Sequence, residues 1–385
     1  MRVLIVALTY QLPIFLSVMN PELNVCAIVT DEPKPAKEIT EKYDQADVPI
    51  IPYWHLKECI ESYQFDYVIN VSDFGSIFTM MTEELQDYGV PSDKIVAILG
   101  LLQPNHVDAL TKLMDRYKQD VEKFKIFATG SSTPQAAIDI DKFELPTINC
   151  AHAAQDLYYD FKIAQELINS GGGGHLRYAL IGLMPYTFDY DVSRTVANSW
   201  LMLQWFLYFR DLHNFCMSVE DYSSLFSKKF LDGGYVKPSE TPIDLNNVYS
   251  DKTANRIIAE GRISTRKAAE KWLKKRYPKT IEEYKKILDD YLTLCDGNGI
   301  KPILFLPPRT AAYVEVFDNN FLNEFYANLI EIMSRHPTAV FFDCWRVPNL
   351  PDDDFSDPIH MNVMGGAKFS YVLNQFVMQF ERNGV

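Results

Sequence analysis

Positive charge is scarce in this chain of 385 residues. Its 37 Lys and Arg residues face 51 Asp and Glu residues, which gives a formal net charge of −14. Nucleic acids and anionic membrane surfaces are bound by clustered positive charge, so this balance disfavours both as partners. Glycine and proline number only 17 and 21, which excludes a fibrous or low-complexity chain. One local basic pocket remains compatible with these numbers.

Cysteine is sparse and widely spaced. No C-x-x-C pair occurs, so neither a zinc ribbon nor a small disulfide framework is expected. The histidines also lack metal-ligand spacing, and we expect no metal site. Most cysteines lie among apolar residues, which predicts reduced, buried thiols in a cytoplasmic protein. The six cysteines are Cys26, Cys59, Cys150, Cys216, Cys295 and Cys344.

No apolar run is suited to crossing a membrane. Residues 1–19 are apolar, but Gln11 and Pro13 interrupt them, and no small-residue cleavage site follows. A strand, a loop and a helix explain this segment better, so we expect no membrane span. A helix expected over 194–216 is rich in aromatic residues, but charged residues such as Arg210 follow them. It is predicted to be a core helix or a surface through which a homo-oligomer forms.

Strands alternate with helices along most of the chain. Residues 2–7 form a continuous apolar run, which is typical of a parallel strand buried on both faces. Repeated βαβ units of this kind predict parallel sheets and an α/β fold. We therefore expect a small Rossmann-like domain over 1–115 and a larger α/β domain over 116–385. The larger domain is expected to carry a helical insertion at about 194–297.

The first strand-to-helix turn lacks the glycine-rich G-x-G-x-x-G sequence. It reads Ala7-Leu8-Thr9-Tyr10-Gln11, so the backbone could not approach a pyrophosphate in the usual way. This argues against a nicotinamide-dependent sugar enzyme. Asp31 ends the second strand, where an acid that binds a cofactor ribose could lie. Acids at that position more often cap a helix or stabilise a turn, and both interpretations of Asp31 remain open.

Three polar residues in the second half of the chain fit one mechanism. Ser132 follows Gly130 and Ser131 directly after a buried strand. Asp357 and His360 lie in a polar loop before the last helix, at a spacing that lets the carboxylate reach Nδ1 of the histidine. Nε2 would then face outward as a general base. Taken alone, the serine motif also fits an ordinary turn, and the Asp-His motif also fits an acidic surface loop. Both motifs are expected at the carboxyl edge of a doubly wound sheet, however, and ligands bind at that edge.

These motifs resemble those of the SGNH (GDSL-type) hydrolases, in the branch related to the teichoic-acid D-alanylation protein DltD. The opening motif is matched by the G-S-S form at 130–132, and the resemblance covers roughly 120–385. The closing motif D-x-x-H-L-N-x-x-G is matched by Asp357, His360, Met361, Asn362 and Gly365. The segment before it resembles the small Rossmann-like modules that precede sugar-modifying and glycan-assembly domains.

The resemblance implies a flavodoxin-like three-layer α/β/α fold for the second domain. It also implies ester hydrolysis or O-acyl transfer on a carbohydrate or cell-envelope substrate, without a cofactor in the acyl step. In this scheme Ser132 is the nucleophile, His360 is the base and Asp357 is its orienting acid. The partner would be a small-molecule or glycan acyl substrate.

The match is incomplete at the oxyanion hole. The family has a Gly after its second strand, where this chain has the stretch 149–155, and an Asn in G-x-N-D, where this chain reads Gly182-Leu183-Met184-Pro185. Loss of one oxyanion donor costs roughly 100- to 1000-fold in rate. Arg309 follows a strand and either binds an anionic group of the substrate or forms a surface ion pair. The candidate oxyanion or substrate-binding residues are Gly130, Asn149, Ala153, Gln155 and Arg309.

Two functions from different classes follow. The first is a cytoplasmic serine esterase or O-acyltransferase that acts on small or lipid-linked glycan precursors. The alternative is a non-catalytic protein of a polysaccharide-modification pathway, which binds a nucleotide sugar or a partner and keeps a degenerate esterase domain. The absent Asn in the third motif favours the alternative.

Overall fold

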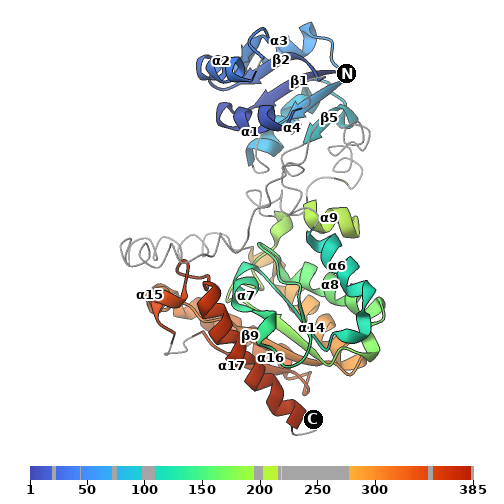
Figure 1. Cartoon of the computed structure of the whole chain (residues 1–385), viewed down its shortest axis with the longest axis vertical. Helices are drawn as coiled ribbons and strands as arrows, with labels where there is room; N and C mark the ends of the chain where they lie inside the picture. Colours follow the sequence, from blue (N-terminus) through green and yellow to red (C-terminus); the bar gives the residue numbers. More distant parts are fainter. Residues whose placement is uncertain are drawn as a thin grey trace. The chain divides into compact units, whose positions relative to one another are not determined.

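The computed structural model of the protein describes residues 1–19, 23–43, 45–71, 76–97, 109–194, 203–215, 218, 277–345 and 350–382. Parallel strands alternate with helices along them, so the protein is α/β, as the hydrophobic pattern predicts (Figure 1). The chain divides into two compact units, 1–110 with 192–243 and 111–191 with 244–385. The predicted boundary near 115 and the predicted insertion at about 194–297 stay predictions, since most of 195–276 lies outside the described residues.

The first unit contains a five-stranded parallel sheet in the order β3-β2-β1-β4-β5. Its central strand β1 is fully buried from Val3 to Ala7, which explains its continuous apolar run. The helices α1 and α2 pack in one core cluster with alternate residues of β1, among them Ile5. The bounds are β1 Arg2–Ala7, α1 Leu12–Val18, β2 Asn24–Thr30, α2 Pro33–Lys42, β3 Ile50–Pro52, α3 Leu56–Ser62, β4 Tyr67–Asn70, α4 Ser76–Asp87 and β5 Ile95–Ala97.

The second unit contains another parallel sheet, in the order β10-β9-β8-β6-β7. The chain runs from β6 to β7 on one side and from β8 to β10 on the other, so the order reverses between β6 and β8. Their carboxyl ends flank the position where doubly wound sheets bind ligands. The strands are β6 Ile126–Gly130, β7 Thr147–Asn149, β8 Tyr178–Gly182, β9 Lys301–Leu306 and β10 Val340–Asp343.

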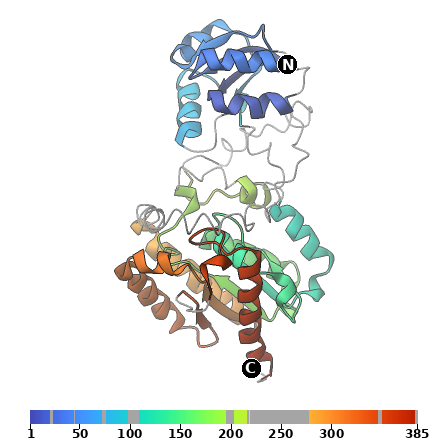
Figure 2. The ribbon, with the colours of Figure 1, turned by 60° about the vertical axis from the view of Figure 1, so that its left-hand side comes forward.

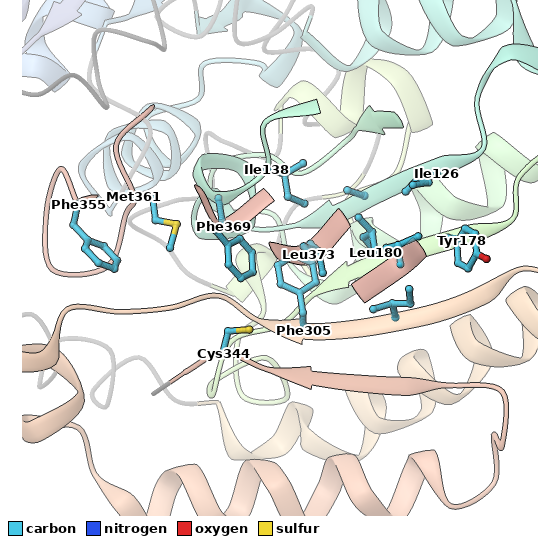
Figure 3. Close-up of a cluster of buried hydrophobic side chains, with 14 residues drawn as sticks. Ile126, Ile138, Tyr178, Leu180, Phe305, Cys344, Phe355, Met361, Phe369 and Leu373 are labelled. Carbon is cyan, nitrogen blue, oxygen red and sulfur yellow. The ribbon is translucent and has the colours of Figure 1, made fainter. Parts of the chain in front are cut away.

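Helices cover both faces of this second sheet (Figures 1 and 2). On one face, α17 packs against α7, and its Phe369 and Leu373 share a core with Leu180 and Phe305 of the sheet (Figure 3). On the other face, α8 packs against α14. The helices are α6 Ala109–Gln119, α7 Ser132–Ala137, α8 Leu157–Asn169, α14 Ile281–Gly297, α15 Ala311–Val316, α16 Asn319–Met333 and α17 Val363–Arg382.

The aromatic helix expected over 194–216 is shorter than predicted. Among the described residues of 194–216, the α-helix is α9, Leu203–Phe209. It ends because Arg210 and His213 have φ angles of 54° and 50°, in the left-handed region that ends a right-handed helix. Trp205 and Phe206 are buried within the chain, which supports a role in the core. Self-association through this segment stays a prediction.

The expectation of free, buried thiols is confirmed where the structure describes the chain. The five cysteines in the described ranges are free and buried. No helix in those ranges has the length and apolar character needed to cross a membrane.

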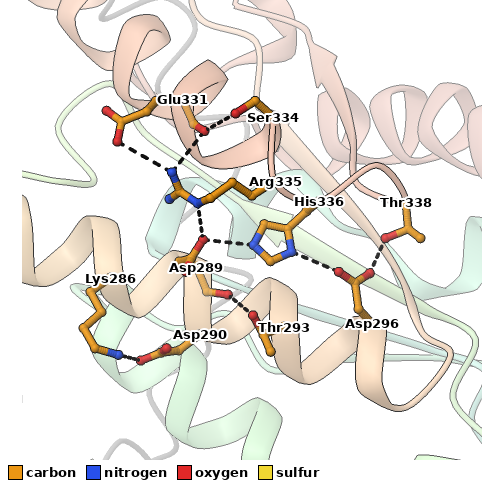
Figure 4. Close-up of polar contacts among 10 residues, drawn as sticks. All are labelled: Lys286, Asp289, Asp290, Thr293, Asp296, Glu331, Ser334, Arg335, His336 and Thr338. Atoms are coloured by element: carbon orange, nitrogen blue, oxygen red, sulfur yellow. Dashed lines mark hydrogen bonds and ion pairs between the residues drawn. The ribbon is translucent and has the colours of Figure 1, made fainter.

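A polar network joins α14 to the turn after α16 (Figure 4). His336 lies between two carboxylates, with Nδ1 2.9 Å from Asp296 Oδ2 and Nε2 3.0 Å from Asp289 Oδ1. Arg335 Nε donates to the same Asp289 oxygen at 2.9 Å. Burial would raise the pKa of Asp289, but the hydrogen bonds from His336 and Arg335 outweigh it and lower that pKa below its ordinary value.

The lowered pKa of Asp289 makes its contribution to stability dependent on pH. A carboxyl whose pKa is lower in the folded state stabilises the fold above its unfolded pKa, and this stabilisation is lost as the pH falls through the folded value. We therefore expect Asp289→Asn to reduce the urea unfolding midpoint more at pH 6 than at pH 3. A reduction that stays constant between these pH values would contradict the proposed pairing.

Candidate active site

The structure brings together the three residues that the sequence assigns to one mechanism. Nδ1 of His360 lies 2.6 Å from Oδ2 of Asp357, and Nε2 lies 2.8 Å from Oγ of Ser132. Ser132 is the first residue of α7, directly after β6, whereas the other two lie in the loop before α17. Segments separated by more than 220 residues therefore meet in a Ser-His-Asp hydrogen-bonded chain.

Hydrogen bonds within the 357–360 turn orient the acid of this triad. Oδ1 of Asp357 accepts the backbone N–H groups of Ile359 and His360, each at 2.8 Å, which leaves Oδ2 for the imidazole. Burial would raise the pKa of Asp357, but the bond with His360 and these N–H groups outweigh it and lower the pKa. The carboxylate thus stays ionised and holds Nδ1 protonated, so that Nε2 can accept a proton from Ser132.

Contacts on both sides hold the loop that carries His360. The carbonyl oxygen of His360 accepts the backbone N–H of Ser356 at 2.9 Å, and Phe355 forms a bridge with Met361. Thr310, in the turn after β9, donates through its hydroxyl to the carbonyl oxygen of Pro358 at 3.1 Å. The imidazole is therefore positioned by backbone bonds rather than by its own contacts alone.

The turn that presents Ser132 requires glycine at its entrance. Gly130 has a φ of 138°, in the region that favours glycine, and a Cβ there would lie 2.7 Å from the carbonyl oxygen of Gly182. The same Cβ would also overlap Pro134 of α7. This close approach lets α7 begin directly above the ends of β6 and β8, where its first residue is the nucleophile candidate.

The start of α17 packs closely against both halves of the site. Asn362 caps this helix, since its Oδ1 accepts the Gly365 backbone N–H at 2.9 Å. A Cβ at Gly365 would overlap the carbonyl oxygen of Asp354, and one at Gly366 would lie 2.6 Å from the carbonyl oxygen of Ala136 in α7. Backbone contact therefore connects the helix after His360 with the helix that carries Ser132.

Two of the side chains considered for the oxyanion hole are occupied elsewhere. Asn149 Nδ2 donates to the carbonyl oxygens of Gln135 and Ile138, at 3.5 and 3.3 Å. Gln155 Nε2 donates to the carbonyl oxygen of Cys150 and to Asp160 Oδ1, at 3.1 and 2.6 Å. An amide nitrogen carries two hydrogens, so neither side chain keeps one for an oxyanion.

The backbone near Ser132 offers the remaining donors. Ser132 lies in the first turn of α7, where a helix leaves N–H groups without intrahelical acceptors. Gly130 uses its carbonyl oxygen to accept the N–H of His152 at 2.9 Å, which ties the segment that contains Ala153 to the nucleophile turn. The backbone N–H groups of Ser132 and Ala153 are therefore the candidate oxyanion donors, and this role stays a prediction.

Arg309 is buried, so the expected alternative of a surface ion pair is wrong. It is 5% exposed, and its guanidinium lies 5.3 Å from the ring of Trp345. Nη2 donates to Thr133 Oγ1 at 3.2 Å and contacts Met184 Sδ at 2.8 Å. Burial lowers the pKa of this guanidinium. Arg309 therefore links the residue after Ser132 to the end of β8, and its binding of an anionic substrate group stays a prediction.

Asp160 is a residue of this region that the sequence analysis missed. It lies on the buried face of α8, accepts the hydrogen bond from Gln155, and also interacts with the backbone of Gly130. Burial raises its pKa well above the ordinary value. Asp160 lies three residues after Leu157 and three before Ile163, so the helical spacing puts it on the apolar face of α8. This spacing is the signal from which its burial could have been predicted.

Asp31 is part of a turn in the first unit. Its Oδ1 accepts the backbone N–H and the hydroxyl of Thr9, each at 2.8 Å, and the hydroxyl of Thr30 at 3.2 Å. Burial would raise the pKa of Asp31, but these bonds outweigh it and lower the pKa. The carboxylate thus closes the turn after β1, which is the ordinary structural role considered for it.

Comparisons with known proteins add little to this geometry. No protein-family model and no curated protein matches the chain. A solved structure from Streptococcus pneumonia, provisionally described as a platelet activating factor, is similar at 10% identity with a TM-score of 0.37. The match covers 72% of this chain and 96% of that one.

The contact between Gly366 and α7 predicts a sensitive position. Gly366→Ala should force α7 and α17 apart at Ala136, with a loss of about 1–3 kcal/mol in the free energy of unfolding. The matched control is Gly297→Ala at the end of α14, where an added Cβ meets nothing within 4 Å. Chemical unfolding of both variants checks this. Equal stability of the two would show that the close approach is not required.

Proposed function

We propose that the protein is a serine esterase or O-acyltransferase of the SGNH (GDSL-type) superfamily that acts on a carbohydrate or on a cell-envelope or glycan precursor. The observation that carries the proposal is the continuous hydrogen-bonded chain from Asp357 through His360 to Ser132. Its distances suit proton transfer from a serine hydroxyl to an imidazole. The order of the second sheet, β10-β9-β8-β6-β7, supports a flavodoxin-like three-layer domain, with the triad at its reversal point.

The proposed reaction proceeds in two acyl-transfer steps. Ser132 Oγ attacks the ester carbonyl carbon while His360 Nε2 takes the hydroxyl proton, and Asp357 stabilises the imidazolium. Backbone N–H groups of Ser132 and Ala153 receive the oxyanion. Collapse breaks the carbon–oxygen bond of the ester, and His360 returns the proton to the leaving alcohol. Water, or a hydroxyl of a sugar, then attacks the acyl-serine by the same sequence.

The cytoplasm is the compartment we propose for this activity. Five described cysteines are free, buried thiols, which suits a reducing environment. The substrate would then be a small or lipid-linked glycan precursor. The alternative of a non-catalytic binding protein is disfavoured by the intact triad, because a degenerate site has no need to preserve these distances.

The nucleophile can be tested with a neighbouring serine as control. Ser132→Ala should abolish labelling by a fluorophosphonate and reduce p-nitrophenyl acetate turnover by at least about 10³-fold, because the attacking oxygen is removed. Ser131→Ala should keep both the labelling and the turnover. In the described structure the Ser131 hydroxyl forms a hydrogen bond only with Thr133 Oγ1, at 3.4 Å. Labelling that is absent from the native protein, or independent of Ser132, would refute catalysis by this triad.

The lowered pKa of Asp357 predicts a simple pH dependence. The lowered pKa keeps the Asp357 carboxylate ionised as the pH falls, so protonation of this carboxylate should not add to the loss of activity on the acid side. The logarithm of kcat/KM for p-nitrophenyl acetate should therefore rise with pH at a slope of one over the acid limb. A slope of two would mean that the Asp357 carboxyl also takes up a proton over this limb, contrary to its lowered pKa.

A further inference from the structure

A groove lies beside the triad, between α7, the short helix Ile140–Lys142 and the start of α17. Its volume is about 470 Å³. Apolar side chains in its lining are Ile138 and Met361, both labelled in Figure 3, together with Val363. Its polar lining includes Gln135, Asp139 and Asp141. None of the residues assigned to the acyl-transfer chemistry is needed to form this groove.

The groove begins close to the nucleophile. Gln135 and Ser132 are three residues apart in α7, so their side chains lie on the same side of the helix, about one turn or 5 Å apart along its axis. On the opposite side, Met361 directly follows His360. Binding in this groove requires that a substrate whose ester carbonyl is at Ser132 extends along α7.

The polar atoms of the groove are mainly acceptors that call for hydrogen-bond donors. Gln135 Oε1 is buried and has no donor within the described structure. Asp139 and Asp141 add carboxylates, with Lys142 Nζ 3.9 Å from Asp139 Oδ2. A buried acceptor that stays unpaired costs about 1–3 kcal/mol, so a ligand that supplies a donor there is favoured. The carboxylates disfavour a ligand that carries negative charge.

We propose that this groove binds the alcohol half of the ester, an uncharged polyhydroxyl ring whose hydroxyls donate to Gln135 and the nearby carboxylates. An acyl chain offers only a carbonyl acceptor and CH groups, so it would leave these acceptors unpaired. A sugar ring offers CH surface for Val363, which is 61% exposed, and hydroxyl donors at its edge. In hydrolysis the ring leaves from the groove with the proton that His360 returns, and in transfer a hydroxyl bound there attacks acyl-Ser132.

This proposal rests on the proposed acyl-transfer activity, and a substitution that fills the groove tests it separately. Val363 is 61% exposed at the first position of α17, so Val363→Trp narrows the groove without changing the core. The ratio of kcat/KM for methyl 6-O-acetyl-glucoside to kcat/KM for p-nitrophenyl acetate should fall at least tenfold. The matched control is Met364→Trp at the next residue, which is 59% exposed and outside the groove lining, and it should leave the ratio unchanged.

A second pair of variants tests the acceptor at Gln135. Gln135→Leu removes the buried oxygen and should raise KM for the acetylated glucoside roughly three- to tenfold, the range of one neutral hydrogen bond. Gln135→Glu keeps an acceptor and should restore most of the loss. Thermal unfolding of each variant reports whether the fold is retained.

The outcomes separate the two proposals. Absence of Ser132-dependent labelling in the native protein overturns the acyl-transfer function itself. A native protein that is labelled and turns over p-nitrophenyl acetate, yet does not turn over the acetylated glucoside, overturns the sugar as the alcohol half. An unchanged substrate ratio in Val363→Trp, or an equal change in Met364→Trp, overturns the groove as its binding site.

Discussion

The close backbone contact between α17 and α7 is the constraint on which the second unit depends. Gly366 lies against the carbonyl oxygen of Ala136, and Gly365 lies against that of Asp354. A side chain at Gly366 would separate the helix that follows His360 from the helix that begins at Ser132, and one at Gly365 would separate it from the turn that contains Asp354. A hydrogen bond of 2.8 Å tolerates little displacement, so the triad exists only while these backbones touch.

Hydrogen bonds from buried polar groups around this contact stabilise the observed position of α17 against α7. Ser370 of α17 donates to the carbonyl oxygen of Ala137 and accepts the backbone N–H of Asp139, at 2.9 and 2.7 Å. Lys368 pairs with the buried carboxylate of Asp354 at 2.7 Å. These bonds hold the C-terminal end of α7 and the acidic turn against one helix. Within the acidic segment 352–357, Asp354 pairs with Lys368 and Asp357 contacts the imidazole.

Much of the fold follows from local patterns in the chain. The apolar run at 2–7 coincides with β1, and the last helix expected after the 357–360 loop is α17, because burial on both faces and a continuous amphipathic stripe leave clear patterns. The helix α2 was missed, since it opens with two prolines in Pro33–Lys42 and buries only Ala36 and Thr40. The three-residue strand β3 is too short to show a period.

The sequence by itself determined the residue types and spacing of the triad, since a three-residue separation in a turn already lets Asp357 reach His360. It could not decide what Asn149, Gln155 and Arg309 do, because their partners come from segments far away in the chain. Only the tertiary structure showed that the side-chain amides of Asn149 and Gln155 donate to other acceptors. It also showed that Arg309 is buried beside Thr133. Contacts between residues close in sequence can be predicted from their spacing. Which hydrogen-bond partners a side chain finds depends on segments that only the folded structure brings together.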